Sequence, residues 1–239
     1  MSVCILALET ATHACSAALL YDEHILYREA AGPKQHSQLI LPMLESLLAE
    51  AGLVRTQLDV IAFGCGPGNF TGVRLATSIA QATAFALDIP VVPVSTLRAL
   101  AQGAWRIGQH RRVLVALDAR LQQVYWGYYQ LGEGQVIAPC TSERVCDPNA
   151  LTVPDPWLYG EADSWIGIGS GWDIYSTSLQ HALSCGEHIH WLAGHYPQAQ
   201  DISVLAWHDY RQGFQVAPEL VTPVYLRDQV VHSPSLREQ

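Results

Sequence analysis

The stretch from residue 59 to residue 87 constrains the fold most, because a glycine-rich turn joins a buried strand to an uncharged helix. Residues 59–64 have the β-branched and aromatic side chains that are typical of a covered strand. The glycines that follow indicate a sharp entry into a helix, with Asn69 or Thr71 as the N-cap. A helix N-terminus beside glycines is a candidate anion site, but the spacing fits neither a Walker A loop nor a dinucleotide fingerprint. Tight packing of the turn is therefore the favoured interpretation, and phosphate binding is the alternative.

Two helices of the first half are predicted to carry more apolar surface than one sheet can cover. Residues 75–87 contain no charged side chain, yet the segment is well short of the roughly 20 apolar residues that a membrane span needs. The helix predicted over 36–51, which Gly52 ends, has apolar positions beyond the ~100° stripe of a single buried face. Pro42 is expected to bend it. Each helix therefore requires a second layer or a second protein over its other side.

The order of the predicted elements indicates a duplicated α/β fold. Three strands are predicted within residues 3–30, and helices and strands then alternate as far as residue 106. A second pass begins at Arg112, where an apolar strand ends in Asp118 as the first strand ends in Glu9. A repeat of roughly a hundred residues indicates gene duplication rather than a solenoid, with a mixed sheet in each half.

The chain is accordingly divided into a first lobe, residues 1–106, and a second lobe, residues 107–239. The first lobe is expected to end with a helix from about 96 to 106 and to carry the surface for a partner protein. The last helix, expected over 201–213, and the apolar tail from 218 to 227 are expected to pack back on the first lobe.

The charge balance argues against a large nucleic-acid surface. The 239 residues carry a net charge of −9 with only 13 Lys and Arg, so no basic patch is broad enough to hold a phosphate backbone. The N-terminal segment lacks a basic start and reaches Glu9 too early for a signal peptide. The six cysteines form no CxxC pair, and we expect a reduced, cytoplasmic protein with no membrane association.

Two acidic residues at strand ends, Glu9 and Asp118, are candidates for holding a metal–nucleotide complex between the lobes. Such sites usually have glycine in the turn after the acid, and here the turns read Thr-Ala-Thr and Ala-Arg-Leu. The alternative interpretation is that both acids cap their turns. His188 and His190 would share one strand face as metal ligands, but surface histidines are favoured because no third ligand is evident.

The glycine stretch over residues 63–74 reads FGCGPGNFTGVR and closely resembles the GPGSFTGVR signature of the TsaB family, also called YeaZ. Asn69 replaces the serine of the signature, and both residues are good N-caps. Further matches to the family cover residues 5–12, 36–38, 41–43, 93–97, 101–105, 116–120, 124–126, 169–172 and 223–227. The resemblance therefore runs nearly from end to end, with residues 142–164 and 186–200 as the unmatched parts.

The resemblance implies a duplicated actin-like ATPase fold of the RNase H-like class, and a role in making threonylcarbamoyladenosine beside the anticodon of tRNA. It implies a non-catalytic partner for a paralogue, TsaD, which holds the metal and the threonylcarbamoyl group and works with the ATPase TsaE. TsaD has an HxxxH pair of metal ligands where this chain has Thr96 and Leu100. We therefore expect no catalytic residue, metal or cofactor of its own, and contact with tRNA only through the complex. Binding of ATP or ADP at a shared interface stays open.

The helices over 36–51 and 70–87 are expected to form a four-helix interface with TsaD, or with a second copy of the chain as a homodimer when TsaD is missing. The residues expected at this interface are His36, Ile40, Met43, Leu44, Leu47, Phe70, Val73, Arg74, Thr77, Ala80, Gln81 and Ala84. The residues that would contact a nucleotide or another anion are Glu9, Gly66, Gly68, Asn69, Thr71, Gly72 and Asp118.

Two other functions stay open from the sequence. One is a free-standing ATPase or sugar-kinase-like phosphotransferase that uses Glu9, Asp118 and the glycine turn. The other is a metallopeptidase-like enzyme. Tight magnesium-dependent ATP binding by the isolated chain would favour the first, and a stoichiometric bound metal would favour the second.

Overall fold

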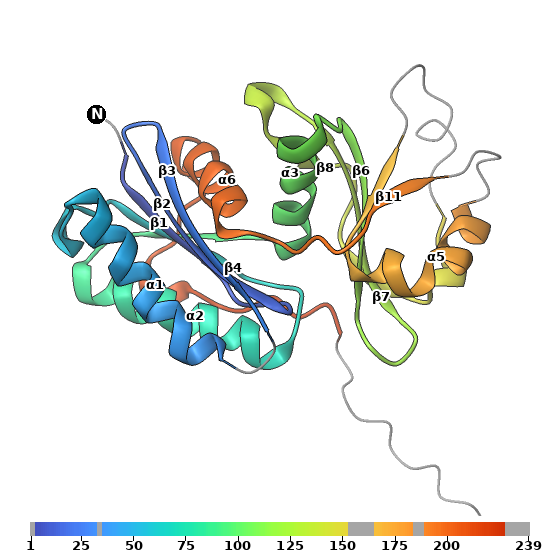
Figure 1. Ribbon diagram of the computed structural model, residues 1–239, viewed down its shortest axis with the longest axis horizontal. Coiled ribbons are helices and arrows are strands. Elements are labelled where there is room, and N and C mark those ends of the chain that lie inside the picture. The colour runs from blue at the N-terminus through green and yellow to red at the C-terminus, as the bar shows by residue number, and fades with distance from the viewer. Residues whose placement is uncertain (1–2, 33–34, 153–164, 184–188, 228–239) are drawn as a thin grey trace, which may run out of the picture.

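The first sheet has the strand order β3-β2-β1-β4-β5 in the computed structural model, which describes residues 3–32, 35–152, 165–183 and 189–227 (Figure 1). Its strands are β1 (Ile5–Glu9), β2 (Ala14–Tyr21), β3 (His24–Ala31), β4 (Val60–Gly64) and β5 (Val91–Val94). β1, β2 and β3 are antiparallel neighbours, whereas β4 and β5 run parallel to β1. β1 and β4 are buried on both faces, which explains why their sequences are continuous apolar runs.

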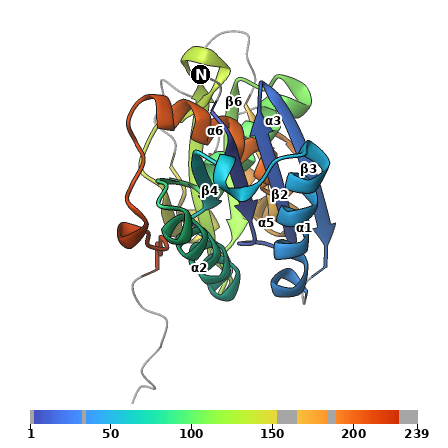
Figure 2. The same cartoon turned by 90° about the vertical axis from the view of Figure 1, so that its left-hand side faces the viewer.

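Helices cover both faces of this first sheet. α1 (His36–Ala51) and α2 (Phe70–Leu87) lie on the outer face, as the turned view in Figure 2 shows. The inner face is covered by α6 (Ala199–Arg211), whose Ile202 and Leu205 pack against β1 and β4. No helix within the described ranges has both the length and the hydropathy needed to cross a membrane.

The second sheet repeats the topology of the first. Its main order is β8-β7-β6-β10-β11, and β9 pairs with β7. The strands are β6 (Arg112–Asp118), β7 (Val124–Leu131), β8 (Ile137–Pro139), β9 (Arg144–Cys146), β10 (Ile166–Ile168) and β11 (His190–Leu192). The first three again form an antiparallel run, and β10 and β11 again run parallel to the strand that opens the repeat. The predicted duplication with a mixed sheet in each half is confirmed.

The helix α3 (Thr96–Gly108) corrects the expected division of the chain. An end of the first lobe at residue 106 would assign α3 to the first sheet, but its Leu97, Leu100 and Ala104 pack on the second sheet. α3 and α6 lie together between the two sheets, and α5 (Ser170–Leu183) covers the outer face of the second sheet (Figure 1). Each sheet is therefore covered on its inner face by a helix from the other half of the chain.

The chain after α6 returns along the first lobe, and we call residues 214–227 the C-terminal strap. Val216 and Val91 exchange both backbone hydrogen bonds, at 2.8 and 2.9 Å, so the strap adds a bridge beside β5. A 3₁₀ turn (Pro218–Leu220) then packs on α2, as Figure 2 shows. Other 3₁₀ turns lie at Arg55–Gln57, Glu133–Gln135 and Pro148–Ala150. Near its end the strap reaches the second lobe, where the Arg227 guanidinium donates to Gln123 Oε1 at 2.6 Å.

Candidate functional site

The glycine turn between β4 and α2 packs backbone to backbone against the turn between β1 and β2. Thr10 Oγ1 donates to the Gly72 carbonyl at 2.6 Å, and the Asn69 N–H donates to the Ala11 carbonyl at 2.7 Å. A Cβ atom at Gly72 would lie 2.0 Å from the Thr10 carbonyl oxygen. At Gly68 it would lie 2.5 Å from the Ala11 carbonyl oxygen. The glycines therefore allow a contact that no larger residue permits.

This packing bears on the anion site expected at the glycines, which stays a prediction. Gly68 and Gly72 face carbonyl oxygens of the β1–β2 turn, and Gly66, with a φ of 107°, faces the Val224 carbonyl of the strap. The side of each glycine where a Cβ would stand is therefore occupied by a backbone carbonyl oxygen, which carries partial negative charge. Asn69 uses its side chain to cap α2, accepting from the Thr71 N–H at 3.1 Å. The glycine turn serves tight packing, which is the interpretation that its spacing favoured.

Glu9 is fully buried at the end of β1 and holds the β1–β2 turn. Its Oε1 accepts from the Ala11 N–H at 2.5 Å, and its Oε2 accepts from Thr96 Oγ1 at 3.5 Å. A Cβ at Gly64 would lie 1.9 Å from Oε2, so glycine at that position makes room for the carboxyl group. Burial raises the pKa of Glu9 to about 7, against the opposing effect of the backbone hydrogen bonds.

Asp118 has the corresponding place at the end of β6 and also caps its turn. Its Oδ1 accepts from the Arg120 N–H at 2.9 Å and from the Tyr175 hydroxyl at 3.2 Å, and the Arg120 guanidinium lies 3.2 Å from Oδ2. Both acids thus accept hydrogen bonds from groups of the chain itself, as the alternative interpretation predicted. In the part of the chain that the structure describes, no group of three or more His, Cys, Asp or Glu residues converges on a possible metal position. His188 lies outside that part, so the suggested pair with His190 has one described member.

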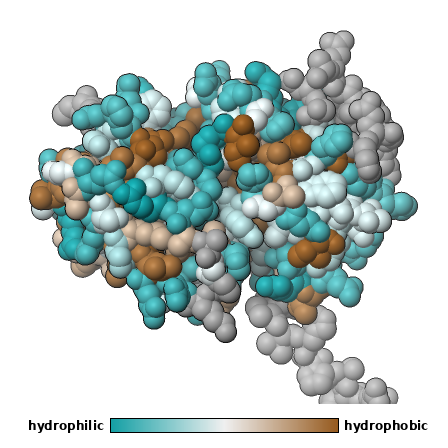
Figure 3. Space-filling model, viewed as in Figure 1, coloured by the Kyte–Doolittle hydropathy of each residue, from teal (hydrophilic) through white to brown (hydrophobic). Residues whose placement is uncertain are grey.

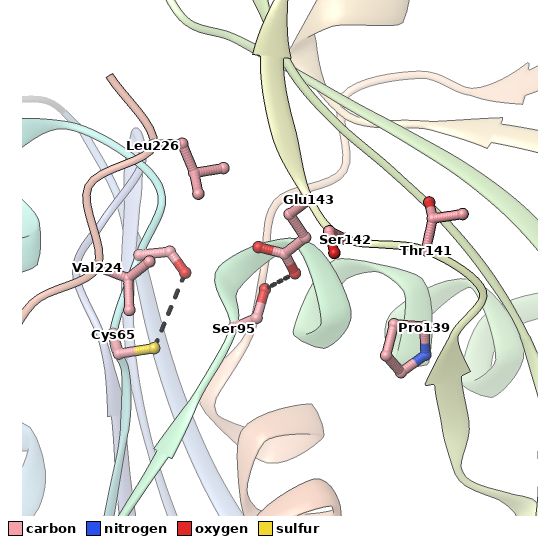
Figure 4. A pocket seen from close by; sticks show the side chains of 9 residues that line it. Cys65, Ser95, Pro139, Thr141, Ser142, Glu143, Val224 and Leu226 are labelled. Carbon is pink, nitrogen blue, oxygen red and sulfur yellow. Dashed lines mark hydrogen bonds between the residues drawn. The ribbon is translucent and has the colours of Figure 1, made fainter. Parts of the chain in front are cut away.

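A pocket of about 350 Å³ opens where the two lobes and the strap meet (Figure 4). Its lining residues are Cys65, Gly66, Ser95, Pro139, Thr141, Ser142, Glu143, Val224 and Leu226. Glu143 accepts hydrogen bonds from the Ser95 hydroxyl, on the first lobe, and from the Tyr129 hydroxyl at 2.6 Å. Burial raises the pKa of Glu143, and it raises the pKa of the Cys65 thiol to about 12. Figure 4 shows Ser95 and Glu143 facing each other, with Cys65 and Val224 to one side. The hydrogen bond between Ser95 and Glu143 therefore joins the two lobes at this pocket, and we call it the seam between the lobes.

Ser95 is expected to contribute strongly to this seam, because one hydroxyl serves two structures. Its oxygen caps α3 by accepting from the backbone N–H groups of Leu97 at 3.1 Å and Arg98 at 3.2 Å. The same hydroxyl donates a hydrogen bond to Glu143. The substitution Ser95→Ala should lower the free energy of unfolding by about 2 kcal/mol, as measured by urea denaturation. Ser142→Ala is the matched control, since that serine is exposed in the same pocket, and it should change stability by less than about 0.5 kcal/mol. Equal effects of the two variants would contradict this role.

The helical residues expected at the partner interface divide by the direction of their side chains. Seven of the twelve are buried: Ile40, Leu44, Leu47, Val73, Thr77, Ala80 and Ala84. Their side chains point mainly into the lobe, and the interface expected for the twelve residues stays a prediction. Phe70 and Arg74 are exposed, and His36, Met43 and Gln81 are partly exposed. The outer side of α2 instead presents Arg74, Ser78, Ala82 and Ala86, which are spaced by four residues.

An aromatic and arginine cluster joins the first turn of α2 to the strap, and its strap member, Tyr225, is not among the site residues predicted from the sequence. The Phe70 and Tyr225 rings stack with their centroids 5.7 Å apart. The Arg74 guanidinium lies 3.8 Å from the Phe70 ring centroid, and its Nε donates to the Tyr225 hydroxyl at 2.8 Å. Phe70 and Tyr225 keep 53% and 43% of their surface exposed, so the cluster is displayed on the outside of the molecule.

The chain is similar to known proteins along most of its length. A protein-family model described as "TsaD: tRNA N6-adenosine threonylcarbamoyltransferase" matches residues 29–234. The tRNA threonylcarbamoyladenosine biosynthesis protein TsaB of Escherichia coli is 38% identical over 95% of each chain. The TsaB protein of Haemophilus influenzae is 36% identical over 95% of this chain and 94% of its own. A solved structure described as YeaZ from Pseudomonas aeruginosa superposes with a TM-score of 0.85 at 41% identity, covering 94% of this chain and all of that one.

Proposed function

The chain belongs to the TsaB family, and we propose that it serves tRNA threonylcarbamoyladenosine synthesis as a scaffold subunit that performs no chemistry alone. The observation that carries this proposal is the match, over 95% of the chain, to relatives named for that synthesis. The match of the TsaD family model to residues 29–234 supports a common origin with the transferase.

The side chains at the positions expected to be catalytic in TsaD support a scaffold role. Thr96 and Leu100 stand where TsaD is expected to have two metal-binding histidines, and both are buried. The Thr96 hydroxyl bonds Glu9, so the start of α3 stabilises the β1–β2 turn. Glu9 and Asp118, the acids that a phosphotransferase would use, accept hydrogen bonds from the turns that they cap.

The partner in this proposal is TsaD, docked on the outer helical side of the first lobe, and a second copy of the chain takes its place when TsaD is absent. TsaE joins the complex as its ATPase, in the cytoplasm, and tRNA meets the chain only through the complex. ATP or ADP binds at the shared interface rather than to this chain alone, because Gly66, Gly68 and Gly72 face carbonyl oxygens. Leu41, Phe70 and Phe85 support docking on α1 and α2, since these large apolar side chains are exposed there.

Reconstitution with purified TsaD and TsaE tests the proposal. The chain should form a complex with TsaD whose mass, measured by light scattering, is the sum of the two subunits. Threonylcarbamoylation of tRNA should require both proteins and should be undetectable with this chain alone. Isothermal titration of ATP with magnesium should give no tight binding to the isolated chain. Modification of tRNA by the lone chain, or the absence of any complex with TsaD, would contradict the proposal.

A further inference from the structure

The pocket between the lobes combines apolar walls with one acidic side chain. Its volume of about 350 Å³ falls within the range of about 300–1,000 Å³ in which proteins bind small molecules. Cys65, Pro139, Val224 and Leu226 supply apolar groups to its walls, and Glu143 supplies the acid. On the face of the molecule seen in Figure 3, apolar residues form separate small patches in a mostly hydrophilic surface. A hollow with apolar walls around a carboxyl group is therefore a distinctive feature.

Glu143 uses one of its two carboxylate oxygens for bonds within the described chain. Its Oε1 accepts from the Ser95 hydroxyl and also from the Tyr129 hydroxyl, the latter at 2.6 Å. No hydrogen bond from the residues that the structure describes reaches Oε2. Figure 4 shows this second oxygen on the side of Glu143 that faces Cys65 and Val224. The chain thus fixes the carboxyl group through one oxygen and presents the other to the pocket.

Glu143 also lacks a cationic partner among the described residues, since none of their ion pairs includes it. The charge of Arg98 opposes the burial that raises the pKa of Glu143. The Arg98 guanidinium, however, donates to both carboxylate oxygens of Asp209, at 2.6 and 3.1 Å. A carboxylate that is partly withdrawn from water without a counter-charge is costly. A cationic ligand would therefore gain a strong, charge-assisted hydrogen bond at Oε2.

The charges around the pocket select against anionic ligands. The pKa of the Cys65 thiol is raised to about 12, first by burial and then by the negative charges of Glu143 and Glu9. The same charges repel phosphates and carboxylates and attract an ammonium group. The side chains of Pro139, Val224 and Leu226 can cover the apolar stem of such a ligand. A simple amine therefore fits the pocket better than a nucleotide does.

We propose that the pocket between the lobes binds a primary ammonium group on a short aliphatic stem, which donates a hydrogen bond to Glu143 Oε2. The stem lies along Pro139, Val224 and Leu226. A free amine and the lysine side chain of another protein share this chemistry. The inference goes beyond the proposed function and does not depend on it, because the site belongs to the chain alone.

Titration of the full chain with n-butylammonium chloride tests this site, followed by ¹H–¹⁵N correlation spectra at about 0.15 M salt. The dissociation constant should be on the order of 1 mM, with the shifts concentrated at the amides of Cys65, Gly66, Thr141 and Val224. 1-Butanol has the same stem without the charge and should bind at least tenfold more weakly. Nα-acetyl-lysine methylamide separates the two sources. Weaker binding than that of n-butylammonium indicates a free amine, equal binding indicates a lysine side chain, and both results agree with the proposal.

Two variants and a matched control locate the bound amine. Glu143→Gln keeps an oxygen for the hydroxyls of Ser95 and Tyr129 but removes the charge, so it should raise the dissociation constant at least tenfold. Ser142→Trp narrows the pocket from an exposed position and should weaken binding even if Glu143→Gln disturbs the seam. Glu219→Gln is the control, because it removes the same charge from an exposed position on the strap and should leave the affinity within twofold. Circular dichroism melting curves verify that each variant is folded.

Four results would overturn the inference. The first is the absence of shifts at the pocket during the titration with n-butylammonium. The second is equal binding of 1-butanol, which would show that Glu143 does not recognise the charge. The third is unchanged binding by Glu143→Gln and Ser142→Trp, which would place the amine elsewhere. The fourth is an equal loss in Glu219→Gln, which would indicate general attraction to a chain of net charge −9. None of them affects complex formation with TsaD, which tests the proposed function separately.

Discussion

Replacing Gly72 by alanine is expected to lower the free energy of unfolding by about 3 kcal/mol, although alanine favours a helix by about 1 kcal/mol over glycine. The new Cβ would lie 2.0 Å from the Thr10 carbonyl oxygen, and backbone atoms on both sides prevent an easy adjustment. Separation of the two turns would also break the 2.6 Å bond from Thr10 Oγ1 to the Gly72 carbonyl. Urea denaturation followed by circular dichroism measures the change.

A matched control lies on the same helix. Ala82 is exposed on the outer side of α2, so Ala82→Ser changes the helix by one small side chain without any contact to the β1–β2 turn. This variant should lose no more than about 0.5 kcal/mol. Stabilisation by Gly72→Ala would mean that helix propensity outweighs the contact, and that the close approach of the two turns has been misjudged.

Replacing Glu9 by glutamine is expected to remove a large part of the pH dependence of stability between about pH 4.5 and pH 7. Burial raises the pKa of Glu9 from 4.5 to about 7, so the folded chain keeps a proton that the unfolded chain has released. The stability linked to that proton is fully present below about pH 4.5 and is lost as the pH rises through about 7. At about 1.4 kcal/mol per pH unit, the loss is on the order of 3 kcal/mol. A glutamine keeps the oxygen that accepts from the Ala11 N–H and carries no charge to bury.

Urea denaturation at intervals from pH 4.5 to pH 8 measures this effect. The wild-type protein should lose stability as the pH rises, while Glu9→Gln should lose less and exceed the wild type at pH 8; the slope that remains belongs to other buried acids such as Glu143. Glu45→Gln is the control, because Glu45 is exposed and pairs with Arg55 on the surface, so its replacement should leave the slope unchanged. An unchanged slope in Glu9→Gln would show that another group titrates.

The local elements follow from the sequence because their signals are local. The helix over 36–51 was predicted at the observed bounds, since Gly52 marks its end and apolar periodicity fills it. The shared topology of the two sheets followed from the repeat that begins near Arg112. The position of α3 did not follow, because its neighbours in the sequence belong to the first sheet and only the folded contacts assign it to the second.

The candidate site was harder to predict, for two physical reasons. The buried face of α2 could not be recognised from the sequence, because the helix has almost no polar side to mark the outside. Residues such as Ala80 were therefore expected at the surface. Glu143 lies in a stretch without apolar periodicity, and its bonds to Ser95 and Tyr129 join segments that are distant in the sequence. The role of the strap depends in the same way on contacts between distant segments, such as that of Tyr225 with Arg74.

The exchange of α3 and α6 between the two sheets has a consequence for the ancestry of the molecule. A chain severed between α3 and β6 would give an N-terminal piece that lacks α6, and a C-terminal piece that lacks α3. Each piece would expose the apolar inner face of a sheet to water. The two halves of the present chain therefore depend on each other to bury their sheets, even if the two ancestral copies once folded alone.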